Sequence, residues 1–356
     1  MTFFDLIQSK GLEQLVFCHD EAVGLRGIIA LHNTLLGPAL APVRMMDYES
    51  EQEAVTDAVL LARNMTYRTA IADCDLGGGS CVIWADPKKG KSEALFRAFG
   101  RFLERFGGRL YVVMGVGTDS MDMHNIQRET DKVLAMNQDH GGIADPVELS
   151  ADGLFQGLKA TARELTGTAS MEGVSCLVQG LGRVGSAIVE RLAKAGATLT
   201  VTDLNYDRIK NIQDKHPDVT MVRPEETYDV RCDIIVPCAP PAPIGQEEIK
   251  RLKCKAISGA SSFVVLDVET ADALHDAGIL YMPHFIMDSG EAIQADFEMK
   301  GVPATRLPDA VEGIYRRVRN IQEIAREAKE SPLRTSLREA QQRLKSIGNI
   351  GRRNAW

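Results

Sequence analysis

The sequence predicts an α/β protein of two domains, and three observations lead to this prediction. The chain has 356 residues, which is long for a single hydrophobic core and sufficient for two. In its second half, short apolar segments alternate with stretches of helical periodicity, as the strands and crossover helices of a parallel sheet require. Between Val174 and Asp203, an apolar run, a glycine-rich turn, a helix and a second apolar run follow one another at a characteristic spacing.

The glycine-rich turn predicts a dinucleotide site. It has the pattern G-x-G-x-x-G, and its six residues are Gly180, Leu181, Gly182, Arg183, Val184 and Gly185. The first glycine permits a tight bend, the second lets the backbone approach a pyrophosphate, and the third lets the helix pack closely on the strand. The helix N-terminus then presents its N–H groups to the pyrophosphate. We therefore expect a Rossmann domain that binds NAD, and the alternative is a structural βαβ unit without a ligand.

The choice of cofactor depends on Asp203. Gly196 ends the helix, the apolar run from Thr198 to Val201 restarts a strand, and Asp203 follows at the carboxyl end of that strand. A carboxylate there accepts the ribose hydroxyls of NAD and repels the 2′-phosphate of NADP. The sequence therefore favours NAD, while Arg208, a few residues further on, leaves NADP open.

Residues 1–136 lack such a turn and are expected to form an α/β substrate and oligomerisation domain. The expected elements are a strand over 28–32, a Gly/Pro-rich loop over 37–45, a helix from a capping box at Ser50-Glu-Gln-Glu53 to Arg68, a helix over 95–106 and a strand over 110–114. Gly77, Gly78 and Gly79 indicate close approach of the backbone to a ligand or to another backbone, and the alternative is a flexible surface turn.

The second domain is expected over residues 137–332, after a polar junction at 137–146. A helix over 149–165 leads into the glycine-rich turn, and further strands are expected at 233–236, 256–258 and 279–282. A helix around residues 311–321 ends at Ser331-Pro332. The last helix, starting at Leu333, is expected to pack on the first domain, so residues 333–356 are assigned to that domain.

Composition excludes several classes of function. A net charge of −8 argues against a nucleic-acid or anionic membrane partner, which leaves a small-molecule substrate. The N-terminus lacks the order of a signal peptide, so we expect a cytoplasmic protein. The seven cysteines and seven histidines are scattered without metal-ligand spacing, so no metal site is expected.

Several segments, taken in order, resemble the glutamate/leucine/phenylalanine/valine dehydrogenases. They are GPAL at 37–40, RNMTYR at 63–68, LGGGS at 76–80, the turn with Asp203, PCA at 237–239 and DSG at 288–290. The resemblance spans nearly the whole chain and is strongest to the leucine, phenylalanine and tryptophan branches, with FCH at 17–19 similar to the tryptophan enzymes. It implies a substrate domain, an NAD domain, hydride transfer between nicotinamide and the α-carbon of an amino acid, and a homo-oligomer built mainly through the first domain.

The same resemblance implies that the catalytic positions are altered. The family has a lysine that binds the substrate carboxylate, a second lysine that handles water and protons, and an aspartate that binds the amino group; here these positions carry Arg68, Ser80 and Gly115. Arg68 can still hold a carboxylate through its planar guanidinium. Ser80 and Gly115 cannot replace the other two groups, and each positioned acid or base typically contributes about 10²–10⁴-fold to the rate.

At other positions that match the family's motifs, some residues differ from those of the family and others are retained. Two glycines after GPAL become Ala41-Pro42, the paired asparagines near substrate and ribose become Ser261-Ser262, and Asn-Ala-Gly-Gly becomes Asp288-Ser-Gly-Glu291. The resemblance assigns Ser150, Ala239 and Ser261 to the cofactor. It assigns to the substrate pocket Leu40, Val113, Ser262, Ala292 and Ala295, whose alternative is ordinary core packing.

Three hypotheses follow. The first is an NAD-dependent oxidoreductase that acts on a small imine, enamine or oxo acid, with Arg68 at the substrate carboxylate. Its candidate proton donors are Ser80, Asp75, Asp288 and Glu291. Any of these four can instead be a solvated or capping side chain. The second is a weak or relocated dehydrogenase of aromatic or branched-chain amino acids. The third is a non-catalytic relative that binds NAD, and a lyase or cyclase that uses the cofactor transiently stays open as a fourth.

Overall fold

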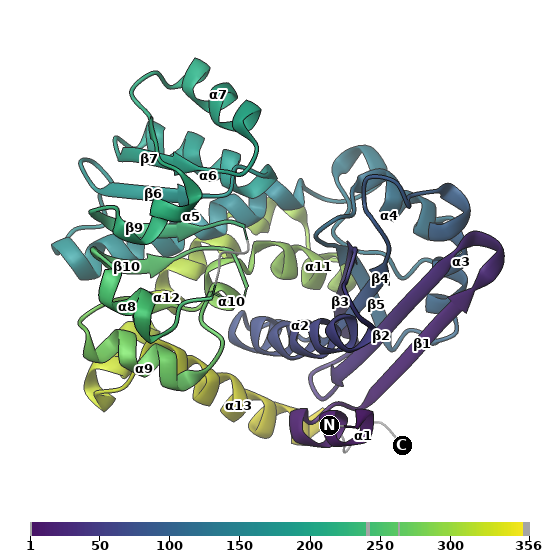
Figure 1. Cartoon of the computed structure of the whole chain (residues 1–356). Helices are drawn as coiled ribbons and strands as arrows, with labels where there is room; N and C mark the ends of the chain where they lie inside the picture. The colour runs from purple at the N-terminus through teal and green to yellow at the C-terminus, as the bar shows by residue number, and fades with distance from the viewer. Residues whose placement is uncertain (1, 240–242, 263, 352–356) are drawn as a thin grey trace. The chain divides into compact units, whose positions relative to one another are not determined.

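The computed structural model describes residues 2–239, 243–262 and 264–351, and the chain divides into two compact units (Figure 1). The first unit contains the residues up to Pro146 together with Ala292–Leu307 and the chain from Ala340 onward. The second unit contains Val147–Glu291 and Pro308–Glu339. Sequence patterns alone do not separate residues 292–307 from the second domain, because the helix that carries most of them begins in the second unit.

The first unit is built on a five-stranded sheet of order β1-β2-β4-β3-β5. Strands β1, β2 and β4 pair antiparallel, whereas β3 pairs parallel with both β4 and β5. Its elements are α1 (Phe3–Lys10), β1 (Gln14–Asp20), η1 (Glu21–Val23), β2 (Leu25–Asn33), β3 (Ala39–Met46), α2 (Glu51–Ile71), β4 (Gly77–Trp84), α3 (Glu93–Glu104), β5 (Leu110–Met114), α4 (Ser120–Gln127), η2 (Gln138–His140), most of α11 (Gly290–Lys300), η4 (Ala304–Arg306) and the later part of α13 (Pro332–Gly351).

Helix α2 begins as its capping residues predict. The Ser50 hydroxyl accepts the backbone N–H of Glu53 at 3.2 Å, while the Glu53 carboxylate accepts the N–H of Glu49 rather than that of Ser50. On the opposite face of the sheet, Phe96 and Phe99 of α3 are fully buried in a core that includes Leu31 and Ile83. The two helices therefore cover the sheet from both sides.

The prediction of a loop over residues 37–45 is wrong, because residues 39–46 form β3, an interior strand of the sheet. Proline is rare in central strands since it has no N–H to donate. Here the ladder with β4 pairs Leu40 with Gly78 and resumes only at Val43 with Cys81, so it is interrupted around Pro42. The pairing of Pro42 with Val113 on the β5 side continues through this point. Local turn signals therefore mislead where two neighbouring strands hold the segment in place.

The glycines of LGGGS form the start of β4 and allow it to pack against other backbone. All three are buried, which excludes the surface-turn alternative. A Cβ on Gly78 would lie 2.1 Å from the backbone nitrogen of Thr66 in α2, and one on Gly77 would lie 2.1 Å from the carbonyl oxygen of Asn33. The three glycines are expected to allow close approach either to a ligand or to another backbone segment, and the structure shows contact with backbone.

The second unit contains a six-stranded parallel sheet of order β11-β10-β9-β6-β7-β8, which confirms the predicted Rossmann fold. Its elements are α5 (Pro146–Thr166), β6 (Ser175–Gln179), α6 (Arg183–Lys194), β7 (Thr198–Thr202), α7 (Tyr206–Lys215), β8 (Thr220–Met221), η3 (Pro224–Asp229), β9 (Cys232–Pro237), α8 (Gln246–Arg251), β10 (Cys254–Ser258), α9 (Val268–Asp276), β11 (Leu280–Met282), α10 (His284–Met287), α12 (Leu307–Ala328) and the first part of α13. The strand order reverses between β6 and β9, where sheets of this kind bind their ligands.

Candidate functional site

The carboxyl ends of β6, β7 and β9 are joined by backbone hydrogen bonds around the glycine-rich turn. The carbonyl oxygen of Gln179 accepts the N–H groups of Cys238 and Ala239, at 2.7 and 3.1 Å, and the N–H of Gly180 donates to the carbonyl of Thr202 at 2.8 Å. The PCA segment is thereby held beside the turn. Residues far apart in sequence are thus brought to the point where the strand order reverses.

Each of the three glycines has a different role in this turn. Gly180 has a φ of +91°, and a Cβ there would lie 2.3 Å from the Cβ of Ala239. A Cβ on Gly185 would lie 1.8 Å from the carbonyl oxygen of Gly180. Gly182 has open space within 4 Å of the position of a Cβ, and no described side chain caps the helix that follows it. Gly180 and Gly185 close the turn, and Gly182 leaves its outer face open to a pyrophosphate, so the residues present fit NAD.

Asp203 is bound into the turn. Its Oδ2 accepts the N–H of Leu181 at 2.6 Å, and its Oδ1 accepts the N–H of Asn205 at 2.7 Å. The Arg208 guanidinium lies 3.6 Å from Oδ2. The carboxylate thus lies at the expected end of β7, but its oxygens already accept hydrogen bonds from the chain.

Ser150 and Ser261 lie among backbone groups of the second unit. A Cβ on Gly290 would lie 2.2 Å from the carbonyl oxygen of Leu149, so the DSG segment packs on α5 beside Ser150. The N–H of Ser261 donates to the carbonyl of Pro237 at 2.9 Å, and its hydroxyl donates to the carbonyl of Ser262 at 3.2 Å. Both serines are more than nine-tenths buried.

Asp288 and Glu291 lie where α10 ends and α11 begins. Both side chains are half-buried, and the N–H of Asp288 donates to the carbonyl of His284 at 2.8 Å. Burial, together with the negative charge of Asp288, raises the pKa of Cys238 to about 12. That thiol stays protonated at neutral pH. The structure therefore brings the carboxylate of Asp288 near the PCA segment.

Ser80 is not placed to donate a proton to a ligand. Its side chain is fully buried under α2, and its hydroxyl donates to the carbonyl oxygen of Ala58 at 2.6 Å. Because a hydroxyl has only one proton, this bond occupies its donor capacity.

Gly115 lies where the chain leaves β5 and contacts the backbone of β3. A Cβ there would lie 2.5 Å from the carbonyl oxygen of Val43. The Thr118 hydroxyl ties the two segments together, since it accepts the N–H of Gly115 at 2.9 Å and donates to the Val43 carbonyl at 2.9 Å. The N–H of Met45 donates to the carbonyl of Val116 at 2.9 Å. An aspartate at this position has no room unless β3 and the loop separate.

Ser80, Ala41-Pro42 and Gly115, three of the sites that the resemblance singles out in the first unit, are neighbours on adjacent strands. The strand order β4-β3-β5 puts Ser80 on one side of Ala41-Pro42, and puts Gly115 on the other side, against Val43. Sequence reasoning treats them as separate substitutions. The structure shows one continuous patch in which side chains are small and backbone segments are in contact.

The other predicted site residues of the first unit lie in three kinds of environment: the end of a helix, an ion pair and the buried core. Arg68 is half-buried on the last turn of α2. Asp75 pairs with Lys300 at 2.7 Å and with Arg343 at 3.4 Å, so this candidate proton donor has a structural role. Four of the proposed pocket residues have exposed fractions of 1% or less, which favours the alternative of core packing: Leu40, Val113, Ala292 and Ala295.

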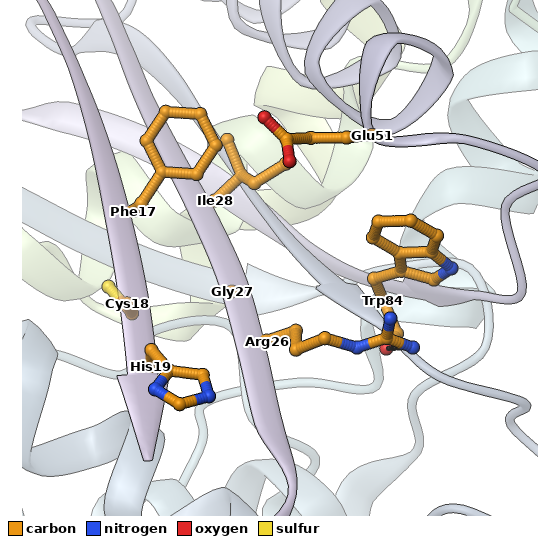
Figure 2. Close-up of a pocket in the computed structure, with 8 residues that line it drawn as sticks. All are labelled: Phe17, Cys18, His19, Arg26, Gly27, Ile28, Glu51 and Trp84. Carbon is orange, nitrogen blue, oxygen red and sulfur yellow. Dashed lines mark hydrogen bonds between the residues drawn. The ribbon is translucent and has the colours of Figure 1, made fainter. Parts of the chain in front are cut away.

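A groove that sequence reasoning missed lies on strands β1 and β2. It has a volume of about 150 Å³ and is lined by Phe17, Cys18, His19, Arg26, Gly27, Ile28, Glu51 and Trp84. Figure 2 shows the rings of Phe17 and Trp84 with Ile28 between them. The Arg26 guanidinium stacks on the Trp84 ring at 4.2 Å from its centroid. Its aromatic residues, Phe17 and Trp84, lie 67 positions apart in the chain, so no local sequence signal brings them together.

Neither a metal centre nor a membrane span is evident in the part of the chain that the structure describes. Among those residues, no group of three or more His, Cys, Asp or Glu side chains could hold a metal ion. No described helix combines the length and apolarity needed to cross a bilayer.

Comparison with known proteins matches both units to one family. The family model "Glu/Leu/Phe/Val dehydrogenase, dimerisation domain" matches residues 13–132, and "Glutamate/Leucine/Phenylalanine/Valine dehydrogenase" matches residues 200–331. A leucine dehydrogenase of Bacillus subtilis is 40% identical, covering 91% of this chain and 89% of its own. A phenylalanine dehydrogenase of Lysinibacillus sphaericus is 41% identical, covering 85% and 81%. The crystal structure of an L-tryptophan dehydrogenase from Nostoc punctiforme superposes with a TM-score of 0.76 at 30% identity, covering 97% of this chain and 99% of its own.

Proposed function

The chain belongs to the Glu/Leu/Phe/Val dehydrogenase family, and from this membership we propose an NAD-dependent hydride transfer that does not use the family's lysine and aspartate. The relatives are amino-acid dehydrogenases, oxidoreductases that act on CH–NH2 donors, and NAD is the cofactor. The proposed substrate is a small carboxylate-bearing imine, enamine, oxo acid or amino acid. Among these, a preformed imine is favoured.

The observation that carries this proposal is the packing around β3. Amino-acid oxidation needs a base for the ammonium group and an activated water for the iminium. The Ser80 hydroxyl is bonded to the Ala58 carbonyl, and Gly115 lies against the Val43 carbonyl with no space for a side chain. By contrast, the three glycines and Asp203 of the cofactor turn fit a dinucleotide. A preformed imine needs neither missing group, since it is reduced without water and without deprotonation of an ammonium.

The residues that we assign to this reaction are Arg68, Asp288 and Glu291. A guanidinium binds a carboxylate through two parallel hydrogen bonds, which suits Arg68 to the substrate carboxylate. Glu291 lies in the first turn of α11, where the helix dipole stabilises a carboxylate. Asp288 or Glu291 would stabilise a protonated imine and hold its proton. NAD, when bound, supplies or accepts the hydride.

A substrate panel tests the proposal. With NADH, we expect kcat/KM for a cyclic imino acid to exceed that for the corresponding 2-oxo acid with ammonium by about 100-fold or more, the lower range for one positioned acid or base. Absorbance at the NADH band gives the rates. Glu291→Gln and Asp288→Asn should each reduce the imine rate, whereas Asp75→Asn should leave it unchanged. Equal rates for the two substrates would contradict the proposal.

The same panel decides the second candidate function, an amino-acid dehydrogenase of the ordinary kind. The 40% identity to a leucine dehydrogenase over most of both chains favours it. Rapid NADH formation from NAD and a branched-chain or aromatic amino acid at alkaline pH would establish it. NADH binding without turnover on any substrate would instead support the non-catalytic alternative.

We further propose that the chain forms a homo-oligomer in which a second copy covers the groove on β1 and β2. The matched dimerisation model includes every residue that lines this groove. Phe17 is 48% exposed, and its ring lies 5.7 Å from that of Phe3. β1 is also an edge strand, whose outer N–H and C=O groups are available for pairing. An aromatic patch beside an open strand edge fits a protein partner.

Phe17→Asp is expected to weaken this association. A buried aromatic anchor contributes about 2 kcal/mol or more to an interface, which corresponds to a roughly 30-fold rise in the dissociation constant. Analytical ultracentrifugation over a range of concentrations measures the change. Met121→Asp is the control, because Met121 is 58% exposed on α4 and does not line the groove. Equal dissociation of both variants, or a monomeric wild type, would refute the interface.

A further inference from the structure

Two histidines that lie 16 positions apart in the sequence meet in the first unit. His124 is on α4 and His140 is in η2, and the centroids of their rings lie 5.3 Å apart with an angle of 54° between the ring planes. We propose that this pair binds a divalent transition-metal ion, such as Ni²⁺ or Zn²⁺, through one nitrogen of each ring. No residue assigned to the cofactor or to the reaction belongs to the pair, so the inference does not depend on the proposed function.

The spacing of the two rings suits a shared ion. Zinc binds imidazole nitrogens at about 2.0–2.1 Å in tetrahedral geometry, which places the centroids of two bound rings roughly 5 Å apart. The observed separation of 5.3 Å is close to this value. The second side-chain torsion of histidine has a broad energy minimum, so rotation of the rings can direct both nitrogens at one ion. Imidazole is also a ligand that suits nickel, copper and zinc.

Asn137 fixes the form of His140 that can bind a metal. The Asn137 Oδ1 lies 2.6 Å from His140 Nδ1, and because an amide oxygen has no proton, the ring nitrogen donates this hydrogen bond. The proton of the neutral imidazole is therefore on Nδ1, and Nε2 keeps its lone pair. Metal-bound histidines almost always donate their other N–H to an oxygen in this way. Asn137 thus orients the ring as a metal ligand requires.

The loop that carries the second histidine is held in place through its backbone. The Glu298 carboxylate accepts the N–H of Ala135 at 2.6 Å and that of Ile143 at 3.2 Å, one on each side of the loop. A Cβ on Gly142 would lie 1.7 Å from the carbonyl oxygen of Met136, so the loop closes on itself tightly. A loop that is already rigid loses less conformational entropy when a ligand binds. The ring is therefore supported in position before an ion binds.

Local charge and the number of ligands define the kind of site. Residues 137–145 contain Asp139 and Asp145 and no lysine or arginine, so this segment does not repel a cation. Within the described part of the chain, no third His, Cys, Asp or Glu side chain completes the pair as a metal centre, so water must fill the other coordination positions. Structural zinc sites have four protein ligands. We therefore expect an ion that exchanges with solvent and that folding does not require.

Titration calorimetry with nickel chloride and with zinc chloride, on the untagged full chain, tests the proposal. We expect one ion per chain. His124→Ala and His140→Ala should each raise the dissociation constant by about tenfold or more, because each removes one of the two protein ligands. Asn137→Ala should raise it by about tenfold, the lower end for loss of an outer-shell partner, whereas Asn137→Asp keeps an acceptor and should retain binding. His275→Ala, which removes an exposed histidine of α9, is the matched control and should change nothing.

Melting temperatures distinguish loss of the site from loss of the fold. Without metal, the histidine variants should melt within about 2 °C of wild type, as for substitutions near the surface. An ion that binds the native chain stabilises it, so nickel should raise the wild-type melting temperature and should not raise that of either histidine variant. Absence of heat from wild type with both ions would overturn the proposal. Binding that survives in either histidine variant with an unchanged dissociation constant would also overturn it, because the two rings would then not share the ion.

Discussion

The double variant Ser80→Lys/Gly115→Asp is expected to unfold more easily than wild type and to gain no amino-acid dehydrogenase activity. These are the residues that the resemblance to the family implies at the two positions. At 115, even the Cβ would lie 2.5 Å from the Val43 carbonyl oxygen, which Thr118 holds in place. At 80, the change removes the hydrogen bond to Ala58 and adds a long charged side chain under α2. Overpacking costs about 1–3 kcal/mol and a lost buried hydrogen bond about 1 kcal/mol, so the free energy of unfolding should fall by about 2–4 kcal/mol.

Urea unfolding followed by fluorescence, and NADH formation from the twenty amino acids, measure the two effects. Gly313→Ala is the matched control, because its Cβ would meet only the ends of the flexible Arg316 and Arg317 side chains within α12. There the higher helix propensity of alanine should raise stability by up to about 1 kcal/mol. A stable and active double variant would show that the packing around β3 can accommodate a lysine at position 80 and an aspartate at position 115. A double variant that is as stable as wild type and still inactive would instead make Ala41-Pro42 and Ser261-Ser262 part of the specificity.

Gly185→Ala is expected to abolish NADH binding and to destabilise the second unit. The new Cβ would lie 1.8 Å from the carbonyl oxygen of Gly180 and 3.2 Å from the Cβ of Cys238, so the turn must open and α6 must move away from β6. This clash involves backbone and cannot be relieved by rotating a side chain. We expect calorimetry to show a loss of NADH affinity of more than about 100-fold, equivalent to about 2.7 kcal/mol, together with a lower melting temperature.

Gly182→Ala is expected to weaken NADH binding without affecting the stability of the fold. Open space surrounds the position of its Cβ, so the melting temperature should stay within about 1 °C of wild type, as for a surface substitution of negligible free-energy cost. The methyl group would occupy the face on which the pyrophosphate approaches the backbone, and NADH affinity should fall by about tenfold or more. Unchanged NADH affinity in this variant would place the pyrophosphate elsewhere.

The cofactor turn and the helix starts follow from the sequence because their determinants are local. One βαβ unit contains the three glycines of the turn and Asp203. The glycines specify the bend after β6 and the close packing of α6, and Asp203 marks the end of β7. Each of these residues occupies its expected place. Ser50 predicts the start of α2 for the same reason, since a capping bond spans only three residues. The family resemblance likewise depends on short segments in order.

Around β3, by contrast, the outcome depends on contacts between distant parts of the chain. Residues 39–46 are an interior strand despite Pro42, because β4 and β5 pair with them from two sides. The Ser80 hydroxyl is hydrogen-bonded to the Ala58 carbonyl, and Asp75 is paired with Lys300 and Arg343. Spacing along the sequence indicates none of these contacts.

Sequence alone determined that this chain carries a dinucleotide turn in a family of dehydrogenases, because the φ/ψ needs of such a turn are encoded in adjacent residues. Only the tertiary structure decided that Ser80 is hydrogen-bonded beneath α2 and that Gly115 lies against the backbone of β3, because the approach of β3, α2 and the β5 loop depends on which strands become neighbours.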